Sequence, residues 1–368
     1  MKILLLADPN SVHTVKWAKS LAQNNIDVFI FGTGHFSVND YDGINNISVR
    51  TLNENVARDE GVLSKISYLK ALPIIKEIIK KNKPDILHAH YASSYGLLGA
   101  LSGFHPFVLS VWGSDVFDFP RKTIIHKQIL KYNLRKADKI LSTSQIMAKE
   151  ISLYTSKEIE IIPFGIDVNF FLPQQNIQSV FEDDAIVVGT VKTLEHIYGV
   201  EYLIKAFKIV IERNKTLPLK LLIVGRGSLK KALKNLVKEL NLEENTIFTG
   251  EIQHAEIPKY LNMLSVYVAL SEKESFGVAV IEASSCAKPV VVSNVGGLPE
   301  VVEDGVSGFI VPSKNPEKAA DAIEKLVLNE RLRKKIGEQG RVRVNKLYNW
   351  NDNVKQMIKI YNNILQND

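Results

Sequence analysis

The chain has 368 residues, of which 45% are hydrophobic and 23% charged, and it carries a formal net charge of +6. This composition excludes disordered, fibrous and low-complexity classes, and the length favours two domains that each bury their own core. No apolar run reaches the ~18 residues of a membrane-spanning helix, and the apolar stretch before Asp8 is too short for a signal peptide. A single cysteine, Cys286, cannot form an internal disulfide, so we expect a cytoplasmic protein.

Short apolar runs alternate with amphipathic stretches over the first 165 residues. The apolar runs lie at residues 2–7, 27–32, 85–91, 107–113 and 139–144, and helical patterns such as that of residues 11–23 separate them. Strands that alternate with helices indicate a mostly parallel sheet with helices on both faces. We therefore predict an α/β domain over residues 1–165.

A second series of the same kind follows a linker. Residues 163–184 contain Pro163, Gly165 and Pro173 and show neither helical nor strand periodicity. The apolar runs of the second series lie at residues 185–191, 219–225, 245–250, 266–271, 289–294 and 308–312. We predict a second parallel α/β domain over residues 180–348, followed by an amphipathic helix at about 350–368 whose pattern allows docking on either domain.

Basic residues are concentrated in the N-terminal part. Residues 1–165 hold 20 Lys and Arg against 15 Asp and Glu, whereas the remainder holds 26 against 25. Lys127, Lys131 and Arg135 recur every four residues and share one face of a predicted helix. That face is either an ordinary solvated surface or a contact with anionic lipid. Nucleic acid is disfavoured, because aromatics are not interleaved and no zinc-finger or helix-turn-helix spacing is present.

Motifs for a dinucleotide, a phosphate loop or a metal are incomplete. Gly225 and Gly227 follow a strand and open a helix, but Lys230 replaces the third glycine of the dinucleotide fingerprint. A tight turn explains these glycines equally well. No GxxxxGK[ST] loop occurs. His88 and His90 lie on one side of a strand end without a third zinc ligand at recognisable spacing, so a metal site is a minor alternative.

The segment "ESFGVAVIE" favours an anion site. Residues 277–286 are predicted to form a helix after the strand at 266–271, and the first amides of a helix are unpaired and attract a diphosphate. Gly277 permits close approach. Glu282 can accept hydrogen bonds from ribose hydroxyls, and Glu274 can reach a second sugar beyond the diphosphate. An ordinary strand-to-helix loop with capping glutamates remains the alternative.

The following segment "NVGGLPEVVEDG" repeats this pattern. It has a Gly-Gly turn, Pro299 at a first helical position and Glu300 after it. We expect two helix starts at one pocket.

With these motifs, the chain resembles the retaining nucleotide-sugar glycosyltransferases of family 4, which have the two-domain GT-B fold with domains facing across a cleft. The resemblance covers nearly the whole chain and is strongest in the E-x7-E motif and in "AKPVVVSNVGGLPEVVEDGVSGFIV". It is weaker in "PFGIDVNFF" and "VWGSDVF", and it implies that the final helix crosses back onto the first domain.

The resemblance also implies roles for individual residues. Glu282 would hold the ribose hydroxyls and Glu274 the hydroxyls of the transferred sugar. The base and the phosphates would meet the loop residue Ile252 and the first-domain residues Asn10 and Ser11. Backbone amides for sugar and phosphate would come from Phe276, Gly277, Val278 and Ala279.

Three positions depart from the family pattern. Thr190 and Tyr198 occupy the places of a basic pair that neutralises the leaving diphosphate, so we expect Lys192 to take over that role with help from Arg226. Trp112 stands where the family has a histidine near the sugar. Asp115 and His90 are candidates for roles on the acceptor side.

The resulting prediction is sugar transfer from a nucleoside diphosphate donor, with UDP as nucleotide, to an acceptor hydroxyl with retention. We expect no metal, since Lys192 and helix N-termini offset the charge, and an acceptor from surface glycan or lipid-linked glycan synthesis at the inner membrane face. One alternative is a nucleotide-sugar 2-epimerase of the same fold. Another is a non-catalytic sugar-binding protein, although such proteins usually work outside the cytoplasm.

Overall fold

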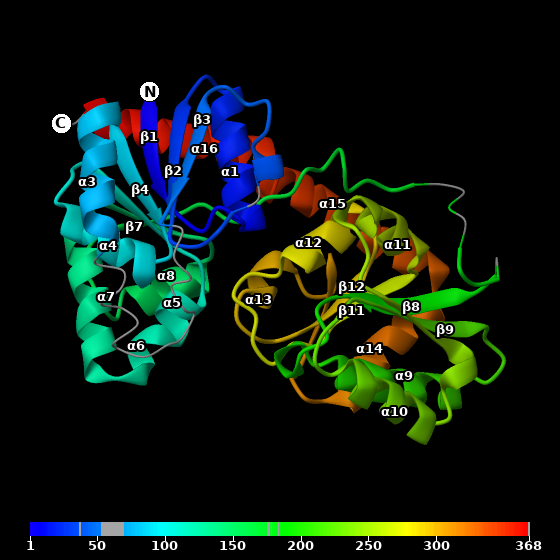
Figure 1. The fold of residues 1–368 in the computed structure, drawn as a ribbon. Helices are drawn as coiled ribbons and strands as arrows, with labels where there is room; N and C mark the ends of the chain where they lie inside the picture. Colours follow the sequence, from blue (N-terminus) through cyan, green and yellow to red (C-terminus); the bar gives the residue numbers. More distant parts are fainter. Residues whose placement is uncertain (37, 53–69, 175–176, 178, 183, 367–368) are drawn as a thin grey trace. The chain divides into compact units, whose positions relative to one another are not determined.

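The computed structural model describes residues 1–36, 38–52, 70–174, 177, 179–182 and 184–366. The chain divides into two compact units (Figure 1): Met1–Pro163 with Asp352–Asp368, the N-terminal unit, and Phe164–Asn351, the C-terminal unit. Each unit holds one parallel sheet with helices on both faces, which confirms the predicted fold class. No described helix is long and apolar enough to cross a membrane.

The N-terminal unit contains a seven-stranded sheet in the order β3-β2-β1-β4-β5-β6-β7. Its strands are β1 (Lys2–Leu6), β2 (Asp27–Gly32), β3 (Ile47–Thr51), β4 (Ile86–His90), β5 (Phe107–Val111), β6 (Lys139–Ser142) and β7 (Ile159–Ile161). Its helices are α1 (Val12–Gln23), η1 (Val38–Asp40), α3 (Ala71–Asn82), α4 (Ser94–Ser102), α5 (Ser114–Phe117), α6 (Phe119–Lys122), α7 (Ile124–Lys136), α8 (Gln145–Ile151) and α16 (Trp350–Gln366). The predicted strands are all present, and the sequence pattern misses only the two edge strands, β3 and β7.

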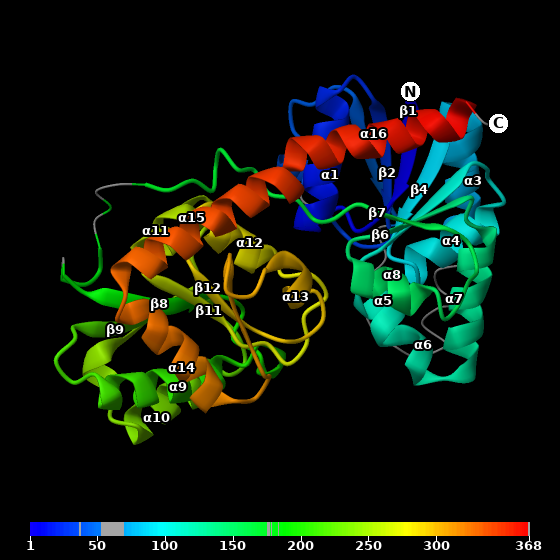
Figure 2. The ribbon, with the colours of Figure 1, turned by 180° about the vertical axis from the view of Figure 1, so that it is seen from behind.

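The central strands of this sheet are continuous apolar runs because both of their faces are covered. Every residue of β4 and β5 is buried, as expected for a parallel sheet between two helical layers. The last helix, α16, covers one face, and Figure 2 shows it lying across the strands. Its Tyr361 is fully buried and bonds through its hydroxyl to His88 Nδ1 at 2.6 Å. The structure therefore places this helix, from Asp352 onward, in the N-terminal unit.

The C-terminal unit contains a six-stranded sheet in the order β10-β9-β8-β11-β12-β13. Its strands are β8 (Ile186–Val191), β9 (Leu219–Val224), β10 (Thr246–Gly250), β11 (Val266–Ala269), β12 (Val290–Ser293) and β13 (Gly308–Val311). Its helices are η2 (His196–Tyr198), α9 (Val200–Arg213), α10 (Lys230–Glu239), η3 (Glu243–Asn245), η4 (His254–Glu256), α11 (Ile257–Met263), α12 (Val278–Ser285), α13 (Leu298–Val301), α14 (Pro316–Val327) and α15 (Glu330–Leu347). In Figure 1, α9, α10 and α14 lie on one face of the sheet and α11, α12 and α15 on the other.

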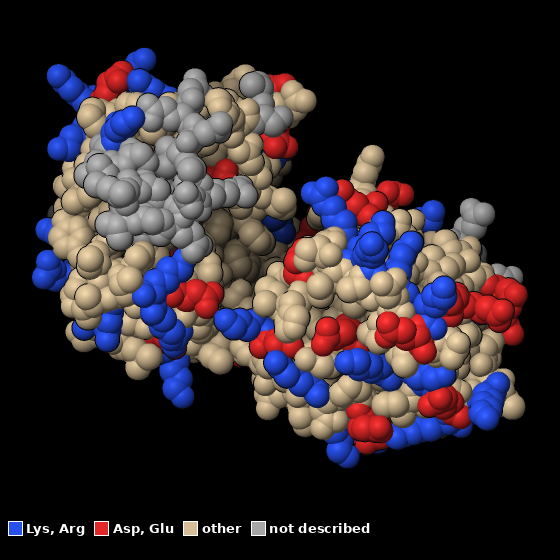
Figure 3. All heavy atoms as spheres, turned by 60° about the horizontal axis from the view of Figure 1, so that its bottom comes forward, with Lys and Arg blue, Asp and Glu red and all other residues tan. Residues whose placement is uncertain are grey.

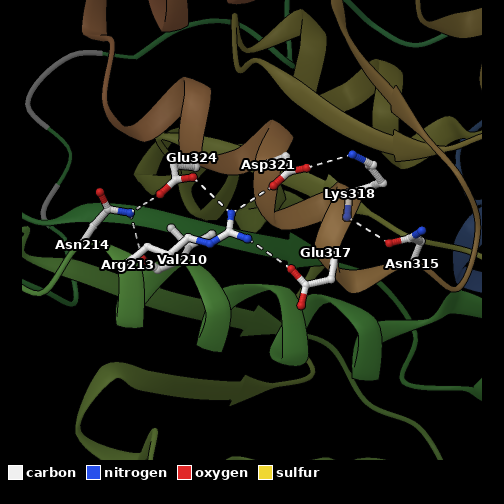
Figure 4. A network of polar contacts seen from close by, with 8 residues as sticks. All are labelled: Val210, Arg213, Asn214, Asn315, Glu317, Lys318, Asp321 and Glu324. Atoms are coloured by element: carbon white, nitrogen blue, oxygen red, sulfur yellow. Dashed lines mark hydrogen bonds and ion pairs between the residues drawn. The ribbon is translucent and has the colours of Figure 1, made fainter.

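A polar network fixes α9 against α14 at the surface of this unit (Figure 4). The Arg213 guanidinium contacts Asp321 at 3.0 Å, Glu317 at 3.1 Å and Glu324 at 3.2 Å. Beneath it the two helices share an apolar core that includes Phe207 and Ile323. The burial of such residues supplies most of the stabilisation, because exposed ion pairs contribute little.

Candidate functional site

The strand order of the C-terminal sheet creates a switch point between β8 and β11. From β8 the chain builds outward through β9 and β10, whereas β11, β12 and β13 are added on its other side. In open parallel sheets, ligands bind beyond the carboxyl ends of the strands at such a point, where the loops diverge. Here Lys192 directly follows β8 and Glu274 lies in the loop after β11. Two residues singled out from the sequence thus meet at the topological switch point.

Lys192 and Glu274 form an ion pair at this position. The Lys192 ammonium donates to a Glu274 carboxylate oxygen at 2.7 Å, and the side chains are only 17% and 14% exposed. The same ammonium lies 4.2 Å from the centroid of the Tyr198 ring. The aromatic face attracts the cation and limits its movement. Tyr198 therefore packs against Lys192, the residue that we expect to act in place of the basic pair of the family pattern.

The second replaced position, Thr190, has a different part in the site. It is buried in β8, and its side chain hydrogen-bonds to Tyr267, which is fully buried in β11. Burial raises the pKa of the Tyr267 hydroxyl above its usual range. Thr190 thus joins the two strands of the switch point and leaves Lys192 as the basic group there.

Gly225 and Gly227 support the loop that carries Lys192. A Cβ on Gly225 would lie 2.0 Å from the Lys192 carbonyl oxygen, and one on Gly227 would lie 2.3 Å from the Leu194 carbonyl oxygen. Leu194 also exchanges backbone hydrogen bonds with this turn, donating to Arg226 O at 2.8 Å and accepting from Leu229 N at 3.0 Å. These contacts favour the turn explanation for both glycines over a dinucleotide fingerprint.

Gly296 and Gly297 support the loop that carries Glu274 in the same way. A Cβ on Gly296, whose φ is +51°, would lie 1.7 Å from the Glu274 carbonyl oxygen. The Gly297 amide donates to that oxygen at 3.0 Å. The helix that follows, α13, has Pro299 in its first turn as predicted, but it is only four residues long. The Gly-Gly turn thus holds Glu274 in place, and a ligand at this second helix start stays a prediction.

The N-terminus of α12 lies next to this loop. The helix spans Val278–Ser285 with Gly277 as its N-cap at φ 110°, as the sequence predicted. The amides of Gly277, Val278 and Ala279 open the helix, and Gly277 O accepts from Val280 N at 3.0 Å. Phe276, by contrast, is 2% exposed and packs its ring against Phe164 and Tyr348. Phe276 can therefore serve a ligand only through its backbone.

Glu282 lies one turn into α12, on a half-buried position of the helix. It is eight residues after Glu274, and both carboxylates act on Tyr267, whose pKa they raise further. The two glutamates of the motif thus both lie within electrostatic range of the same buried tyrosine. This places them at one end of the C-terminal sheet, as the spacing suggested.

A third glutamate of this loop was not predicted. Glu272 contacts Lys314 at 2.7 Å and accepts a hydrogen bond from the Tyr202 hydroxyl at 2.8 Å. Its hydrogen bond from Lys314 lowers the pKa of its carboxyl. Its amide donates to Ile197 O at 2.7 Å, which ties the η2 turn and hence Tyr198 to the β11 loop. Nothing in the spacing of "SEKES" distinguishes this supporting carboxylate from Glu274.

The remaining donor-side candidates of this unit lie along the carboxyl ends of β9 and β10. Arg226 forms an ion pair with Glu251 at 2.8 Å, and both side chains are largely exposed. Ile252 follows Glu251 and is half-buried. Arg226 is thus directed toward β10, and the Lys192–Glu274 contact does not include it.

The N-terminal sheet has its own switch point, between β1 and β4. His90 ends β4, and its ring lies 4.5 Å from that of Trp112, which follows β5. His13, at the start of α1, lies 5.6 Å from Trp112, and His88 lies 4.7 Å from His90. The sequence did not point to His13; its position just after the first strand is the signal that could have identified it.

Burial keeps these histidines neutral. It lowers the pKa of His13 to about 4 and that of His88 to about 3, and it holds the pKa of His90 well below 6.5. His88 is satisfied by Tyr361 and Ser110. His90 is 2% exposed, and its Nδ1 has no hydrogen-bond partner among the described residues. An unpaired buried nitrogen at the end of a strand is suited to a ligand that supplies the missing bond.

Asp115 lies next to this cluster, and within the described part of the chain its carboxylate accepts hydrogen bonds from backbone amides alone. It is fully buried, and its oxygens accept from the amides of Ala92 and Gly113, both at 2.7 Å, and of Trp112 at 3.2 Å. Burial raises the pKa of its carboxyl to about 6, although these hydrogen bonds oppose the shift. Asp115 therefore joins the loops after β4 and β5. This geometry favours a positioning role over contact with a substrate.

Asn10 and Ser11 lie in the loop after β1. The Asn10 side chain donates to His35 O at 2.6 Å, and Ser11 is the N-cap residue of α1 without a capping bond from its side chain. Both positions are near the switch point of their own sheet. Among the described residues, no group of three His, Cys, Asp or Glu is placed to hold a metal ion.

Comparison with protein families matches both units of the chain. Residues 2–144 match the family described as Glycosyl transferase 4-like, and residues 173–343 match Glycosyl transferases group 1. An uncharacterized glycosyltransferase of Methanocaldococcus jannaschii is 30% identical over 315 residues, which cover 80% of each chain.

Two solved structures extend the similarity to the whole fold. Sucrose-phosphate synthase from Thermosynechococcus elongatus superimposes with a TM-score of 0.83 at 21% identity, covering 100% of both chains. Anabaena HepE, solved in complex with UDP, superimposes with a TM-score of 0.81 at 18% identity, covering 99% of this chain and 100% of that one.

Proposed function

The chain belongs to family 4 of the glycosyltransferases, and from this premise we propose that it transfers a hexosyl group from a UDP-sugar to an acceptor hydroxyl with retention. The observation that carries the proposal is the Lys192–Glu274 ion pair at the switch point of the C-terminal sheet. UDP as the nucleotide is supported by HepE, which was solved with UDP and with UDP-glucose.

Each group of the C-terminal site has a part in this reaction. As the sugar–phosphate bond breaks, negative charge develops on the leaving diphosphate, and Lys192 and the first amides of α12 stabilise it. Glu274 accepts hydrogen bonds from hydroxyls of the transferred sugar, and Glu282 accepts them from the ribose. Since Lys192 supplies a fixed positive charge, we propose that the reaction needs no metal ion.

Retention follows from a displacement on one face of the sugar. The acceptor oxygen bonds to the anomeric carbon from the side that the phosphate leaves, and a phosphate oxygen takes the acceptor proton. The protein then contributes positioning and charge stabilisation rather than a covalent nucleophile. The ion pair with Lys192 supports this role for Glu274, because a carboxylate held by a cation is suited to binding hydroxyls rather than to attack.

We assign the acceptor to the switch point of the N-terminal sheet. A sugar ring can stack on Trp112, and an acceptor hydroxyl can donate to the unpaired Nδ1 of His90. A neutral, aromatic site suits an uncharged glycan hydroxyl. We place the reaction in the synthesis of a surface polysaccharide or a lipid-linked glycan.

A turnover assay tests this function. The full chain is incubated in EDTA with UDP-glucose, UDP-galactose and UDP-N-acetylglucosamine, with and without a panel of glycan acceptors, and UDP release is measured. We expect acceptor-stimulated release and an axial product linkage by NMR, as in the donor. Conversion of donor alone into its 2-epimer would establish the epimerase alternative, and tight donor binding without any turnover would establish the binding protein.

A further inference from the structure

One surface of the N-terminal unit is not used by the proposed reaction. The helix α7 buries His126, Leu130, Asn133 and Leu134 against the unit. Beside it, residues of α7 and α4 line a shallow, open apolar hollow of about 330 Å³. The residues that line it are Leu97, Ile124, Ile125, Gln128, Ile129 and Tyr132. Two of these apolar side chains, Ile124 and Ile125, remain 68% and 51% exposed.

These side chains follow the spacing of one helical face. Ile124, Gln128 and Tyr132 are four residues apart, as are Ile125 and Ile129, so the residues form adjacent rows along α7. The exposed isoleucines lie at the start of the helix, where Thr123 caps it by accepting from the His126 amide. A capped helix thus presents exposed branched side chains in its first turn.

A row of positive charge runs beside the apolar rows. Lys127, Lys131 and Arg135 recur every four residues along α7 and are exposed. Between Asp118 and Asp138 the chain has six basic residues and no acidic one. Arg121, just before α7, forms an ion pair with Glu150 at 2.7 Å. Figure 3 shows the same imbalance on a larger scale: blue exceeds red on the N-terminal unit, whereas the two colours alternate on the C-terminal unit.

The basic helix α10 of the C-terminal unit provides a contrast. It carries four lysines, Lys230, Lys231, Lys234 and Lys238, but it also has Glu239 and presents no exposed large hydrophobic residue. A solvated basic face therefore exists elsewhere in the same chain without bare isoleucines. The combination of both features on α7 needs a surface that is anionic and apolar at once.

We propose that α7 docks the N-terminal unit onto an anionic lipid bilayer. Ile124 and Ile125 enter the boundary between headgroups and acyl chains, and the lysine row contacts lipid phosphates. Tyr132 lies between the acyl boundary and the lipid phosphates. Arg135 and Lys136 lie 5.6 and 5.9 Å from its ring, and an aromatic ring beside basic groups is suited to a bilayer interface. The inference does not depend on the proposed reaction.

Vesicle sedimentation of the full chain tests the docking surface. The probes are vesicles of phosphatidylcholine alone and of phosphatidylcholine with phosphatidylglycerol, at about 0.1 M and about 1 M salt. We expect binding to the anionic vesicles that falls at least tenfold at high salt, because screening shortens the Debye length from about 10 to about 3 Å. Equal binding to both vesicle types, or none to either, would overturn the proposal.

Paired variants locate the surface. Ile124→Ser with Ile125→Ser and Lys127→Gln with Lys131→Gln should each lower vesicle binding by about tenfold or more. The controls are Lys231→Gln with Lys234→Gln on α10, and Leu328→Ser with Val342→Ser, which are each 59% exposed in the C-terminal unit. If the controls weaken binding as much as the α7 variants do, α7 is not the docking surface.

Sedimentation velocity tests whether a second copy of the chain, rather than lipid, occupies the hollow beside α7. We expect the same sedimentation coefficient for the wild type and for the Ile124→Ser, Ile125→Ser variant in the absence of lipid. Self-association that this variant abolishes, together with a lack of vesicle binding, would assign the hollow to a protein contact and overturn the lipid proposal.

Discussion

The two units place very different chemistry at equivalent positions of their sheets. At the switch point of the C-terminal sheet, Lys192 and Glu274 are charged, partly exposed and next to the start of α12. At that of the N-terminal sheet, the half-buried His13 and the buried His88 and His90 are uncharged, and the rings of His13 and His90 lie next to Trp112. Parallel topology fixes where a ligand can bind, whereas the side chains after a few strands decide which ligand it is.

The backbones around the two points are held by different means. In the C-terminal unit, glycines let neighbouring loops approach the carbonyl groups of Lys192 and Glu274. In the N-terminal unit, one buried carboxylate, Asp115, gathers the amides of two loops. A charged site for a diphosphate and a neutral site for a glycan hydroxyl are the functional interpretation of this contrast, and the following variants test it.

The largest effect is expected at the charged switch point of the C-terminal sheet. Lys192→Met should lower kcat/KM by about 10²–10³-fold and weaken UDP binding, because a preorganised cation for the leaving group is lost. Glu274→Gln should lower turnover similarly. UDP binding should change little, since Glu274 binds the hydroxyls of the transferred sugar and not the nucleotide. Initial rates and calorimetry measure the two effects.

The matched control is the exposed pair of Glu330 and Lys334 on α15, which are 2.6 Å apart. Glu330→Gln and Lys334→Met remove the same groups without approaching the switch point, and both should behave like the wild type. Full turnover of Lys192→Met would contradict the assignment of the charged site.

A smaller effect is expected at the uncharged switch point of the N-terminal sheet. His90→Phe should raise KM for the acceptor by about tenfold and leave UDP binding unchanged, whereas thermal stability should stay the same or rise, because an unsatisfied buried nitrogen is removed. The control is His126→Phe, which replaces a buried histidine packed on Phe119 away from the strand ends. A structural role for His90 alone would move stability and spare the acceptor KM.

The glycine support can be tested by a pair of alanine substitutions. Gly296→Ala places a Cβ 1.7 Å from the Glu274 carbonyl oxygen, so the loop must shift, and we expect weaker donor binding and a stability loss of about 1–3 kcal/mol. Gly305→Ala has a similarly positive φ of +73° but meets nothing within 4 Å. If calorimetry finds both variants equally impaired, backbone strain rather than the contact with Glu274 is responsible.

The smallest effect is the pH dependence that the histidines of the N-terminal unit contribute. The pKa values of His13, His88 and His90 are lower in the folded state than the usual 6.5, so their stabilisation is lost as pH falls from about 6.5 toward 4. Asp115 opposes this over about pH 6 to 4, because burial raises its pKa to about 6. With three groups against one, the net effect is destabilisation in acid.

Tryptophan fluorescence can isolate this effect. The chain has three tryptophans, and in a Trp350→Phe background the remaining Trp17 and Trp112 both report on the N-terminal unit. Urea midpoints at pH 7.5 and 5 should differ more than in the same background with His13→Asn. An equal loss in both proteins would show that His13 is not neutral in the folded state.

The fold could be predicted from the sequence wherever burial is complete. Strands covered on both faces, such as β4 and β5, are uninterrupted apolar runs. The edge strands β3 and β7 were missed because they are half-covered and short: β3 alternates half-buried with exposed residues, and β7 has only three residues. The contact of α16 with the N-terminal sheet includes pairs far apart in the sequence, such as Tyr361 and His88, which are separated by 273 positions.

The site was predictable where the chemistry of a residue type and its place after a strand coincide, as for Glu274 and Lys192. Supporting contacts were not, because they depend on three-dimensional approach. Glu272 and Tyr198 hold the pair through separate loops, and the Gly297 amide donates to the Glu274 carbonyl oxygen. Asp115 was a candidate for a role on the acceptor side, and nothing in "WGSD" indicates that its oxygens accept from amides of two loops.

A nucleotide titration in EDTA tests the charged switch point most directly. The melting temperatures of the wild type and of Lys192→Met are recorded with UDP, GDP and ADP; a ligand at about 100 times its Kd stabilises by roughly 2.7 kcal/mol. We predict that UDP stabilises the wild type without metal and that Lys192→Met loses most of this shift. Equal shifts in both proteins, or none with any nucleotide, would contradict the assignment of a diphosphate to Lys192 and α12.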